Sequence, residues 1–381
     1  MSPFFGKPTS GAVGASPCEC VDVVLADLDG VIYAGPKAIA HAVESLNGVQ
    51  THKRVGYITN NASRTDAQVA EHLRSLGLLV ESGDIVTSPQ AAVPLLAQLV
   101  APGSTILVVG GDGLTAEVEK NGFTVTRTAE DNPAAVIQGF SPDVGWRQLA
   151  EAAFVLNAKP SADAFGGTIA GEGEGIPWVA TNMDWTIPQE RGVDPGNGTL
   201  VSAVHTAVGR LPVVAGKPEL PIFVEAGRRF GVAEQPQRAL FIGDRLDTDV
   251  MGGARAGMMT ALVLTGIDQA KQLLSAPAGS RPDYILGDLR ELTQPYPEIV
   301  RHKNGAISVG QARVRKVGMD LVIEAEKSVG SSGTETGGSH DAASGGVGYN
   351  DDLDLLRAAC QVIWDSGLAI FGFNVPERLY I

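Results

Sequence analysis

Hydrophobic positions follow two alternating periodicities along this chain, and together they predict its fold class. Residues 21–26 and 54–59 form short apolar runs that are typical of buried strands. After the second run, apolar residues recur at helical spacing, at Val69, Leu73 and Leu76. The alternation returns later, with helical patterns at 221–230 and 251–256 and strand patterns at 239–242 and 260–265. This order predicts an α/β fold with a parallel sheet covered by helices.

The middle of the chain carries elements of its own, which we interpret as an inserted second domain. Residues 105–109 and 134–138 have strand patterns, and residues 146–156 have a helical pattern. We therefore expect a flexible lead-in, a core domain in two parts, an inserted α/β domain between them and a C-terminal appendage. Their predicted bounds are 1–20 for the lead-in, 21–86 and 200–297 for the core, 87–199 for the insertion, and 298–381 for the appendage.

The appendage is predicted to be a small αβ unit. Residues 306–325 resemble a hairpin, and residues 328–348 are rich in Gly and Ser, which is typical of a flexible linker or a long loop. A helix is expected over 351–365, because acidic residues fill its first turn and Gly367 follows its end. A final strand is expected at 368–373.

Charge and composition exclude several classes of partner. The net charge is −14 and no run of Lys and Arg is present, so nucleic acid is not an expected partner. No apolar run approaches the roughly 20 residues that span a bilayer, and the first residues lack the pattern of a secretory signal. The three cysteines, Cys18, Cys20 and Cys360, cannot form a disulfide framework. We expect a cytoplasmic protein.

Two carboxylates stand one residue apart where the first strand ends, at Asp27 and Asp29. A turn that begins at Asp29 would let one carboxylate act as a nucleophile while the other reaches the leaving group. Such a pair can also hold Mg²⁺ and attack phosphate. The alternative interpretation is a strand end followed by acidic turn residues, which is the commoner origin of a short acidic motif.

Three further segments favour the functional interpretation of Asp27 and Asp29 over that of acidic turn residues. Thr59 and Asn60 follow a strand and can bind a phosphoryl oxygen, and Lys217 lies between Gly216 and Pro218 ahead of a helix, where it can be fixed beside an anion. An acidic loop at 243–249 supplies oxygen ligands that suit Mg²⁺. Each segment alone has a structural explanation. All of them follow or flank apolar strands, however, so they are expected to converge at the carboxyl edge of an open sheet.

These segments resemble the motifs of the haloacid dehalogenase (HAD) superfamily, in the branch of NagD-like and para-nitrophenyl-phosphatase-like enzymes. The resemblance covers roughly residues 21–292. It implies a Rossmann-like core and an inserted α/β cap that excludes water from the reaction. The tail and residues 190–198 are most similar to actinobacterial glycerol 3-phosphate phosphatases. The segment 158–175 is longer than the corresponding connection in relatives. The resemblance also allows a homodimer, which relatives commonly form through the cap.

The resemblance implies a role for each site residue. Asp27 would be the nucleophile and Asp29 the general acid and base. The metal ligands would be Asp27, Asp244 and the backbone carbonyl of Asp29, with Asp249 holding metal-bound water or orienting Lys217. Thr59 and Lys217 would bind the phosphate, and Asn60 and Gly30 would contribute backbone or amide contacts to it. Dehalogenases lack the second acid and the metal, so the presence of Asp29 favours phosphate chemistry.

Substrate choice is expected to lie in the cap. Residues 180–186 resemble the cap segment that faces the leaving group in relatives, which makes Asp184, Trp185 and Thr186 specificity candidates; the alternative is a surface loop with an anchored Trp. The expected function is a magnesium-dependent phosphomonoesterase acting on glycerol 3-phosphate. Phosphoglycolate, pyridoxal phosphate, a nucleotide or a phosphotransferase reaction are the alternatives. A phosphate-binding regulatory module would be expected to lose Asp27 or Asp29, and both are present.

Overall fold

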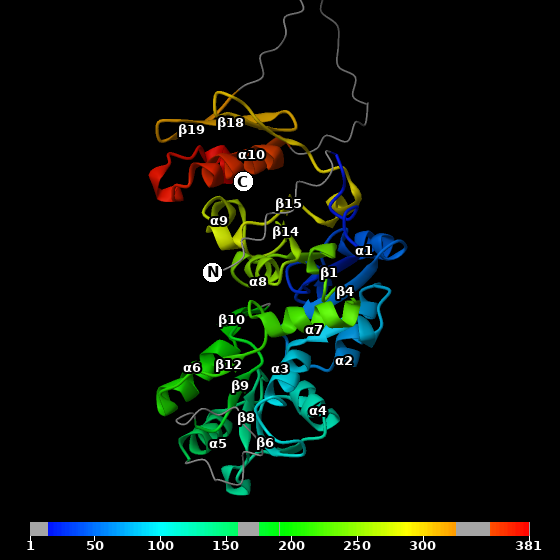
Figure 1. Cartoon of the computed structure of the whole chain (residues 1–381), viewed down its shortest axis with the longest axis vertical. Coiled ribbons are helices and arrows are strands. Elements are labelled where there is room, and N and C mark those ends of the chain that lie inside the picture. The colour runs from blue at the N-terminus through cyan, green and yellow to red at the C-terminus, as the bar shows by residue number, and fades with distance from the viewer. Residues whose placement is uncertain (1–13, 159–174, 190, 325–350, 381) are drawn as a thin grey trace, which may run out of the picture.

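The structure, a computed structural model, describes residues 14–158, 175–189, 191–324 and 351–380. Its parts follow one another along the long axis of the molecule (Figure 1): the inserted domain lies at one end, a six-stranded sheet lies in the middle, and the C-terminal appendage lies at the other end. The predicted linker 328–348, most of the lead-in and nearly all of the long segment 158–175 lie outside the described residues. No helix among the described residues is long and apolar enough to cross a membrane.

The central sheet is entirely parallel, as the alternation of strands and helices predicts. Its strand order is β15-β14-β13-β1-β4-β5. The strands are β1 (Val23–Ala26), β4 (Arg54–Thr59), β5 (Ile85–Thr87), β13 (Ala239–Gly243), β14 (Met259–Val263) and β15 (Tyr284–Leu286). The register places Ala26 between Ile242 and Tyr57, so β13 and β4 end only one and two residues beyond the end of β1. Polar residues that follow these strands therefore meet at one edge.

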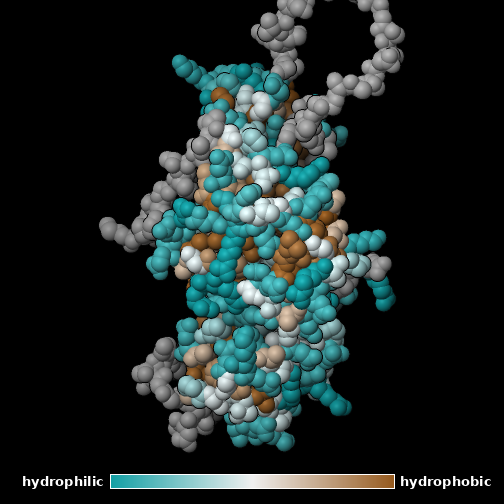
Figure 2. All heavy atoms as spheres, turned by 90° about the vertical axis from the view of Figure 1, so that its right-hand side faces the viewer, coloured by the Kyte–Doolittle hydropathy of each residue, from teal (hydrophilic) through white to brown (hydrophobic). Residues whose placement is uncertain are grey.

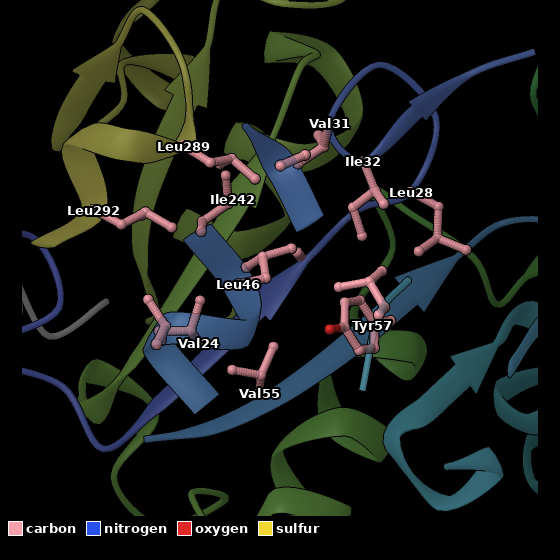
Figure 3. Packing of buried hydrophobic residues seen from close by; sticks show 14 of the residues in the cluster. Val24, Leu28, Val31, Ile32, Leu46, Val55, Tyr57, Ile242, Leu289 and Leu292 are labelled. Atoms are coloured by element: carbon pink, nitrogen blue, oxygen red, sulfur yellow. The ribbon is translucent and has the colours of Figure 1, made fainter. Parts of the chain in front are cut away.

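Helices cover both faces of this sheet. Val24 of β1 packs with α1 (Ala42–Gln50) and α2 (Asp66–Ser75), whereas Val23 packs with α3 (Ser88–Leu96) and α7 (Leu220–Phe230). Figure 3 shows the first of these clusters, in which Leu28, Val31 and Ile32 hold the segment after β1 in the core. The short α8 (Met251–Arg255) and α9 (Ala270–Leu274) flank β14 in the chain. Figure 2 shows the face that lies on the right in Figure 1, where hydrophobic side chains gather mainly at mid-height.

The inserted domain contains a second parallel sheet, of order β12-β9-β8-β6-β7. Its strands are β6 (Thr105–Val109), β7 (Thr124–Thr126), β8 (Ala135–Gln138), β9 (Trp178–Ala180) and β12 (Val213–Val214); its helices are α4 (Asp112–Lys120), α5 (Trp146–Asn157) and α6 (Asn197–Val208). The structure differs here from the predicted boundary at residue 199. That boundary falls inside α6, whose Val201 and Val204 are buried against this sheet, and β12 pairs with β9.

Two small hairpins project from these domains. The hairpin of β2 (Tyr33–Ala34) and β3 (Lys37–Ala38) follows the two carboxylates Asp27 and Asp29 after β1, and the hairpin of β10 (Thr186–Gln189) and β11 (Gly192–Pro195) belongs to the inserted domain.

The appendage contains more strands than the predicted hairpin. Its antiparallel sheet joins β16 (Ile299–Arg301), β17 (Ile307–Val309), β18 (Ala312–Val317) and β19 (Asp320–Ile323), and α10 (Asp351–Ser366) packs against it. The expected strand at 368–373 is wrong, because residues Ile370–Gly372 form a 3₁₀ turn. The turn leaves Phe371 97% exposed, whereas a strand would have had to bury one of its faces.

Candidate active site

The carboxyl edge of the central sheet opens into a cavity of about 610 Å³ between the core and the inserted domain. The four segments predicted to converge there do so. The cavity is lined by predicted residues from all four segments and from the cap, namely Asp27, Asp29, Gly30, Thr59, Asn60, Asp184, Thr186, Lys217 and Asp244. Asp249 lies beneath it, with no exposed surface. The exception is Trp185, which is 60% exposed and does not line the cavity.

Lys217 is a buried cation between two carboxylates. Its Nζ atom lies 2.7 Å from Oδ1 of Asp27 and 2.7 Å from Oδ1 of Asp249. Burial opposes the charge on the lysine, but the two carboxylates outweigh it and raise the pKa of Lys217 above its usual range. The lysine therefore stays charged beside Asp27, where it can offset the repulsion between a carboxylate and an incoming phosphate.

Asp244 completes a cluster of carboxylates that can hold a cation. Oxygen atoms of Asp27, Asp244 and Asp249 all lie within 4.8 Å of one another. Burial first, and then the charges of Asp249 and Asp27, raise the pKa of Asp244 to about 8. A divalent cation would remove this repulsion, and hard oxygen donors are the ligands that Mg²⁺ and Ca²⁺ prefer. The residues present therefore fit a metal of that class.

Close backbone approaches hold Asp244 in place. The backbone N–H of Ile267 donates a hydrogen bond of 2.7 Å to its Oδ2 atom. Gly30, with φ +77°, lies so close that a Cβ atom there would be 2.2 Å from the same oxygen. The hydroxyl of Thr265 in turn donates to the carbonyl of Gly30 at 2.7 Å. A side chain at position 30 would therefore displace the ligand.

Asp29 has an environment that suits proton transfer. Burial raises its pKa, and the nearby charge of Lys217 opposes the rise. The hydroxyl of Tyr33 lies 3.5 Å from its Oδ2 atom. A carboxyl with a raised pKa can carry a proton toward a leaving group, which is the role that the motif implies.

The side-chain amide of Asn60 is bonded within the protein, whereas a contact of its backbone with phosphate stays a prediction. Its side-chain amide is occupied by protein groups: Oδ1 accepts from the backbone N–H of Lys217 at 2.8 Å, and Nδ2 donates to the carbonyl of Lys217 at 3.1 Å and to Oδ1 of Asp184 at 3.0 Å. Asn60 thus fixes the lysine and joins the two domains, so the phosphate contact expected of its side chain is not free to form. Thr59 accepts a hydrogen bond of 3.1 Å from the backbone N–H of Asn61 through Oγ1.

The cavity also contains residues that the sequence motifs did not single out. Asn182 donates to the backbone carbonyl of Asn60 at 2.7 Å, and Asn197 donates to the carbonyl of Asn182 at 2.8 Å. Arg245 and Thr248 line the cavity from the acidic loop. A signal for Asn197 existed in its flanking glycines, because a Cβ atom at Gly196 or Gly198 would lie within 2.5 Å of backbone atoms of the cap segment. The others lie among ordinary polar loop residues.

The sequence similarities agree with this geometry. A profile of haloacid dehalogenase-like hydrolases matches residues 24–124, and a HAD-hydrolase-like profile matches residues 214–292. A D-glycerol 3-phosphate phosphatase of Mycobacterium tuberculosis is 43% identical over 273 residues, which are 72% of this chain and 71% of that protein. The chain belongs to the haloacid dehalogenase-like hydrolase family. The prediction of a HAD-family phosphatase is thereby confirmed.

A solved structure of this family extends the likeness to nearly the whole chain. A glycerol phosphate phosphatase of M. tuberculosis in complex with magnesium is 35% identical with a TM-score of 0.74, and the match covers 95% of this chain and 94% of that one. A p-nitrophenyl phosphatase of Archaeoglobus fulgidus is 27% identical with a TM-score of 0.62; the match covers 98% of that chain but 72% of this one. The HAD core and cap are thus shared with p-nitrophenyl phosphatases, as predicted.

Proposed function

We propose that this protein is a magnesium-dependent phosphatase of glycerol 3-phosphate. The observation that carries the proposal is the position of Asp27, which lies in contact with the buried Lys217 and within 4.8 Å of two further carboxylates. The names of the M. tuberculosis relatives support the substrate, and the magnesium in one of their structures supports the metal. A cytoplasmic location and a homodimer remain predictions from the sequence and the family resemblance.

The first half-reaction transfers the phosphoryl group to the protein. An oxygen of Asp27 attacks phosphorus, and Lys217 and the hydroxyl of Thr59 bind the phosphoryl oxygens. A bound magnesium ion, held by Asp27, Asp244 and the carbonyl of Asp29, would offset the repulsion between the carboxylate and the phosphate dianion. Asp29 gives its proton to the departing alkoxide, which leaves as the alcohol.

The second half-reaction returns Asp27 to its starting state. Asp29, now ionised, takes a proton from water, and the resulting nucleophile attacks phosphorus of the aspartyl phosphate. The bond between phosphorus and the Asp27 oxygen breaks, which releases inorganic phosphate and the free carboxylate. The cap closes the cavity above these groups, which keeps other nucleophiles away. Asn60 contributes by holding the backbone of Lys217 at the correct place.

The cap side of the cavity suits a small alcohol with hydroxyl groups. Asp184 and Asn197 are buried or nearly so and offer polar atoms, and Thr186 lies on the same side. Burial raises the pKa of Asp184, and the hydrogen bond from Asn60 opposes the rise. Hydroxyls of glycerol could donate to this carboxylate. The carboxylate of phosphoglycolate would be repelled by that of Asp184. Phosphoglycolate, pyridoxal phosphate and nucleotides are nevertheless the alternatives within the family.

A panel of phosphate esters tests the proposal. Phosphate release from glycerol 3-phosphate, phosphoglycolate, pyridoxal phosphate and AMP would be measured with and without magnesium, for the wild type and for Asp27→Asn. We expect glycerol 3-phosphate to give the highest kcat/KM and the substitution to abolish turnover. Faster turnover of another ester would replace the substrate, and transfer of the phosphoryl group to an added alcohol in preference to water would indicate a phosphotransferase.

A further inference from the structure

The C-terminal appendage shares one hydrophobic core with the loop that carries Asp244 and Asp249. Leu246 and Val250 of this loop are 6% and 1% exposed and belong to a cluster that also contains α9 and most of the buried residues of the appendage. The appendage contributes to that cluster Ile307, Val309, Val314, Leu321, Leu355, Leu356, Val362 and Ile363, among others. Leu246 and Val250, which closely follow Asp244 and Asp249 in the chain, are thus packed in one cluster with residues of the appendage.

A second connection passes through α9. The segment between β14 and α9 contacts the metal site directly, because Ile267 donates to Asp244 at 2.7 Å and the carboxylate of Asp268 accepts from the backbone N–H of Leu246 at 2.6 Å. Helix α9 begins two residues later, at Ala270, and packs against α10. Figure 1 shows α9 between β14 and α10. A shift of α10 would therefore act on the segment that holds Asp244.

Buried polar contacts fix α10 on the core. Arg357, 1% exposed, donates from Nε to the carbonyl of Ile285 at 3.0 Å, and it pairs with Asp354 at 2.8 Å and with Glu291. Its guanidinium also lies over the ring of Tyr296, 4.7 Å from the centroid. Because Ile285 belongs to the edge strand β15, these bonds join the appendage to the central sheet and leave α10 little freedom to move alone.

We propose that the appendage is a positioning element for the metal site: α10 supports Leu246, Val250 and α9, and so holds Asp244 and Asp249 at the spacing that binds the cation. The match with the A. fulgidus protein covers 98% of that chain but only 72% of this one, so that protein is too short to contain every part of this chain. In this chain the face of the core formed by Leu246, Val250 and α9 is apolar, and α10 covers it. The appendage therefore acts through the loop and does not touch the substrate.

Matched cavity variants test this role. Leu356→Ala opens a cavity in the shared cluster, and Leu156→Ala opens one of the same kind in α5, at the opposite end of the molecule (Figure 1). The two leucines are 3% and 5% exposed. Magnesium binding would be measured by calorimetry without substrate, together with hydrogen exchange of residues 244–250 and kcat at saturating magnesium.

We expect Leu356→Ala to raise the Kd for magnesium by about threefold to tenfold, a size typical of coupling through packed side chains. It should also speed hydrogen exchange in residues 244–250, while excess magnesium restores kcat. Leu156→Ala should leave the Kd unchanged. Equal effects of the two variants, or an unchanged Kd in Leu356→Ala, would overturn the proposal. If Leu356→Ala does not fold, Ile363→Val, which removes one methyl group from the same cluster, is judged by the same criteria.

The inference rests on the metal site of the proposed function, but it is separable from the substrate. Wild-type protein that binds magnesium and fails to hydrolyse glycerol 3-phosphate would remove the proposed substrate and leave the positioning role open to the same comparison of Kd values. Wild-type protein that binds no magnesium would overturn both.

Discussion

Asn60 of the core donates a hydrogen bond of 3.0 Å to Asp184 of the inserted domain, so the two sides of the cavity are joined directly. The same side chain bonds both backbone groups of Lys217. Domain contact and lysine position therefore depend on one amide. The side chain of Asn60, which its motif suggests as a phosphate ligand, is thus bonded to protein groups instead.

Asn60→Ala should lower kcat/KM by about tenfold to a hundredfold, because three hydrogen bonds are lost and their buried partners are left unsatisfied. Steady-state kinetics with glycerol 3-phosphate measures this. Asn121→Ala is the control, since that amide bonds only Glu117, on the surface of α4. A loss of the same size in both variants would contradict the role given to Asn60.

Asp184→Asn should change selectivity more than rate. The substitution removes the negative charge and keeps an oxygen that can accept from Asn60, so the ratio of kcat/KM for glycerol 3-phosphate to that for phosphoglycolate should fall by about tenfold. Trp185→Ala should leave the ratio unchanged, because Trp185 does not line the cavity. An unchanged ratio in Asp184→Asn would remove Asp184 from the specificity residues.

Magnesium binding should strengthen as the pH rises through about 8, the value to which burial raises the pKa of Asp244. In the folded, metal-free protein Asp244 keeps its proton at pH values above the ordinary pKa of an aspartate. The free energy of unfolding of the metal-free protein should therefore fall as the pH rises from about 4 toward 8. Magnesium displaces the proton and reverses the loss. Thermal melts with and without magnesium at about pH 6 and pH 8 measure the effect. A magnesium shift that is larger at the lower pH would refute it.

Gly30→Ala should abolish magnesium-dependent activity, because the new Cβ atom would meet Oδ2 of Asp244. Gly103→Ala is a matched control: both glycines have φ +77°, and no atom lies within 4 Å of a Cβ at position 103. Each variant should lose about 1 kcal/mol of stability from the backbone conformation. Melting curves and phosphate release separate that common loss from the specific one, and comparable activity of the two variants would disprove the clash.

Thiol labelling reports whether the appendage stays docked. Cys20 is exposed, whereas burial raises the pKa of Cys18 to about 11 and also raises that of Cys360 in α10. In the native protein iodoacetamide should modify Cys20 rapidly and the other two only after unfolding, which mass spectrometry detects. Rapid modification of Cys360 in native protein would show that α10 separates from the core.

Strand-end chemistry was predictable from the sequence because it follows local rules. Apolar runs predicted β1, β4 and β13, and polar residues immediately after parallel strands must meet at one edge. Asp27, Thr59 and Asp244, which end or follow strands of the central sheet, therefore converge as expected. Lys217 follows β12 of the inserted domain, so this rule does not account for its position. The final turn at 370–372 was not predictable, because a short apolar stretch has the same pattern whether it pairs with a strand or lies exposed.

Contacts between distant segments were beyond the reach of motif spacing. The bonding of Asn60 to Asp184 spans 124 residues, and nothing in a Thr-Asn turn indicates that the amide faces another domain. The end of the inserted domain was missed for a related reason: β12 has only two residues, and its place in the second sheet depends on pairing with β9 and not on its own pattern.

The return of the chain from the inserted domain has a mechanical consequence. Val214 pairs within the sheet of that domain, and three residues later both backbone groups of Lys217 are bonded to a core residue. On this return connection, the residues between the two sets of bonds are Ala215 and Gly216, and a Cβ atom on the glycine would strike Asn60 and the backbone of Thr181. A pivot on this side of the cap would lie there. A pivot there would leave Lys217 with the core, so an opening of the cap would keep its contacts with Asp27 and Asp249 in place.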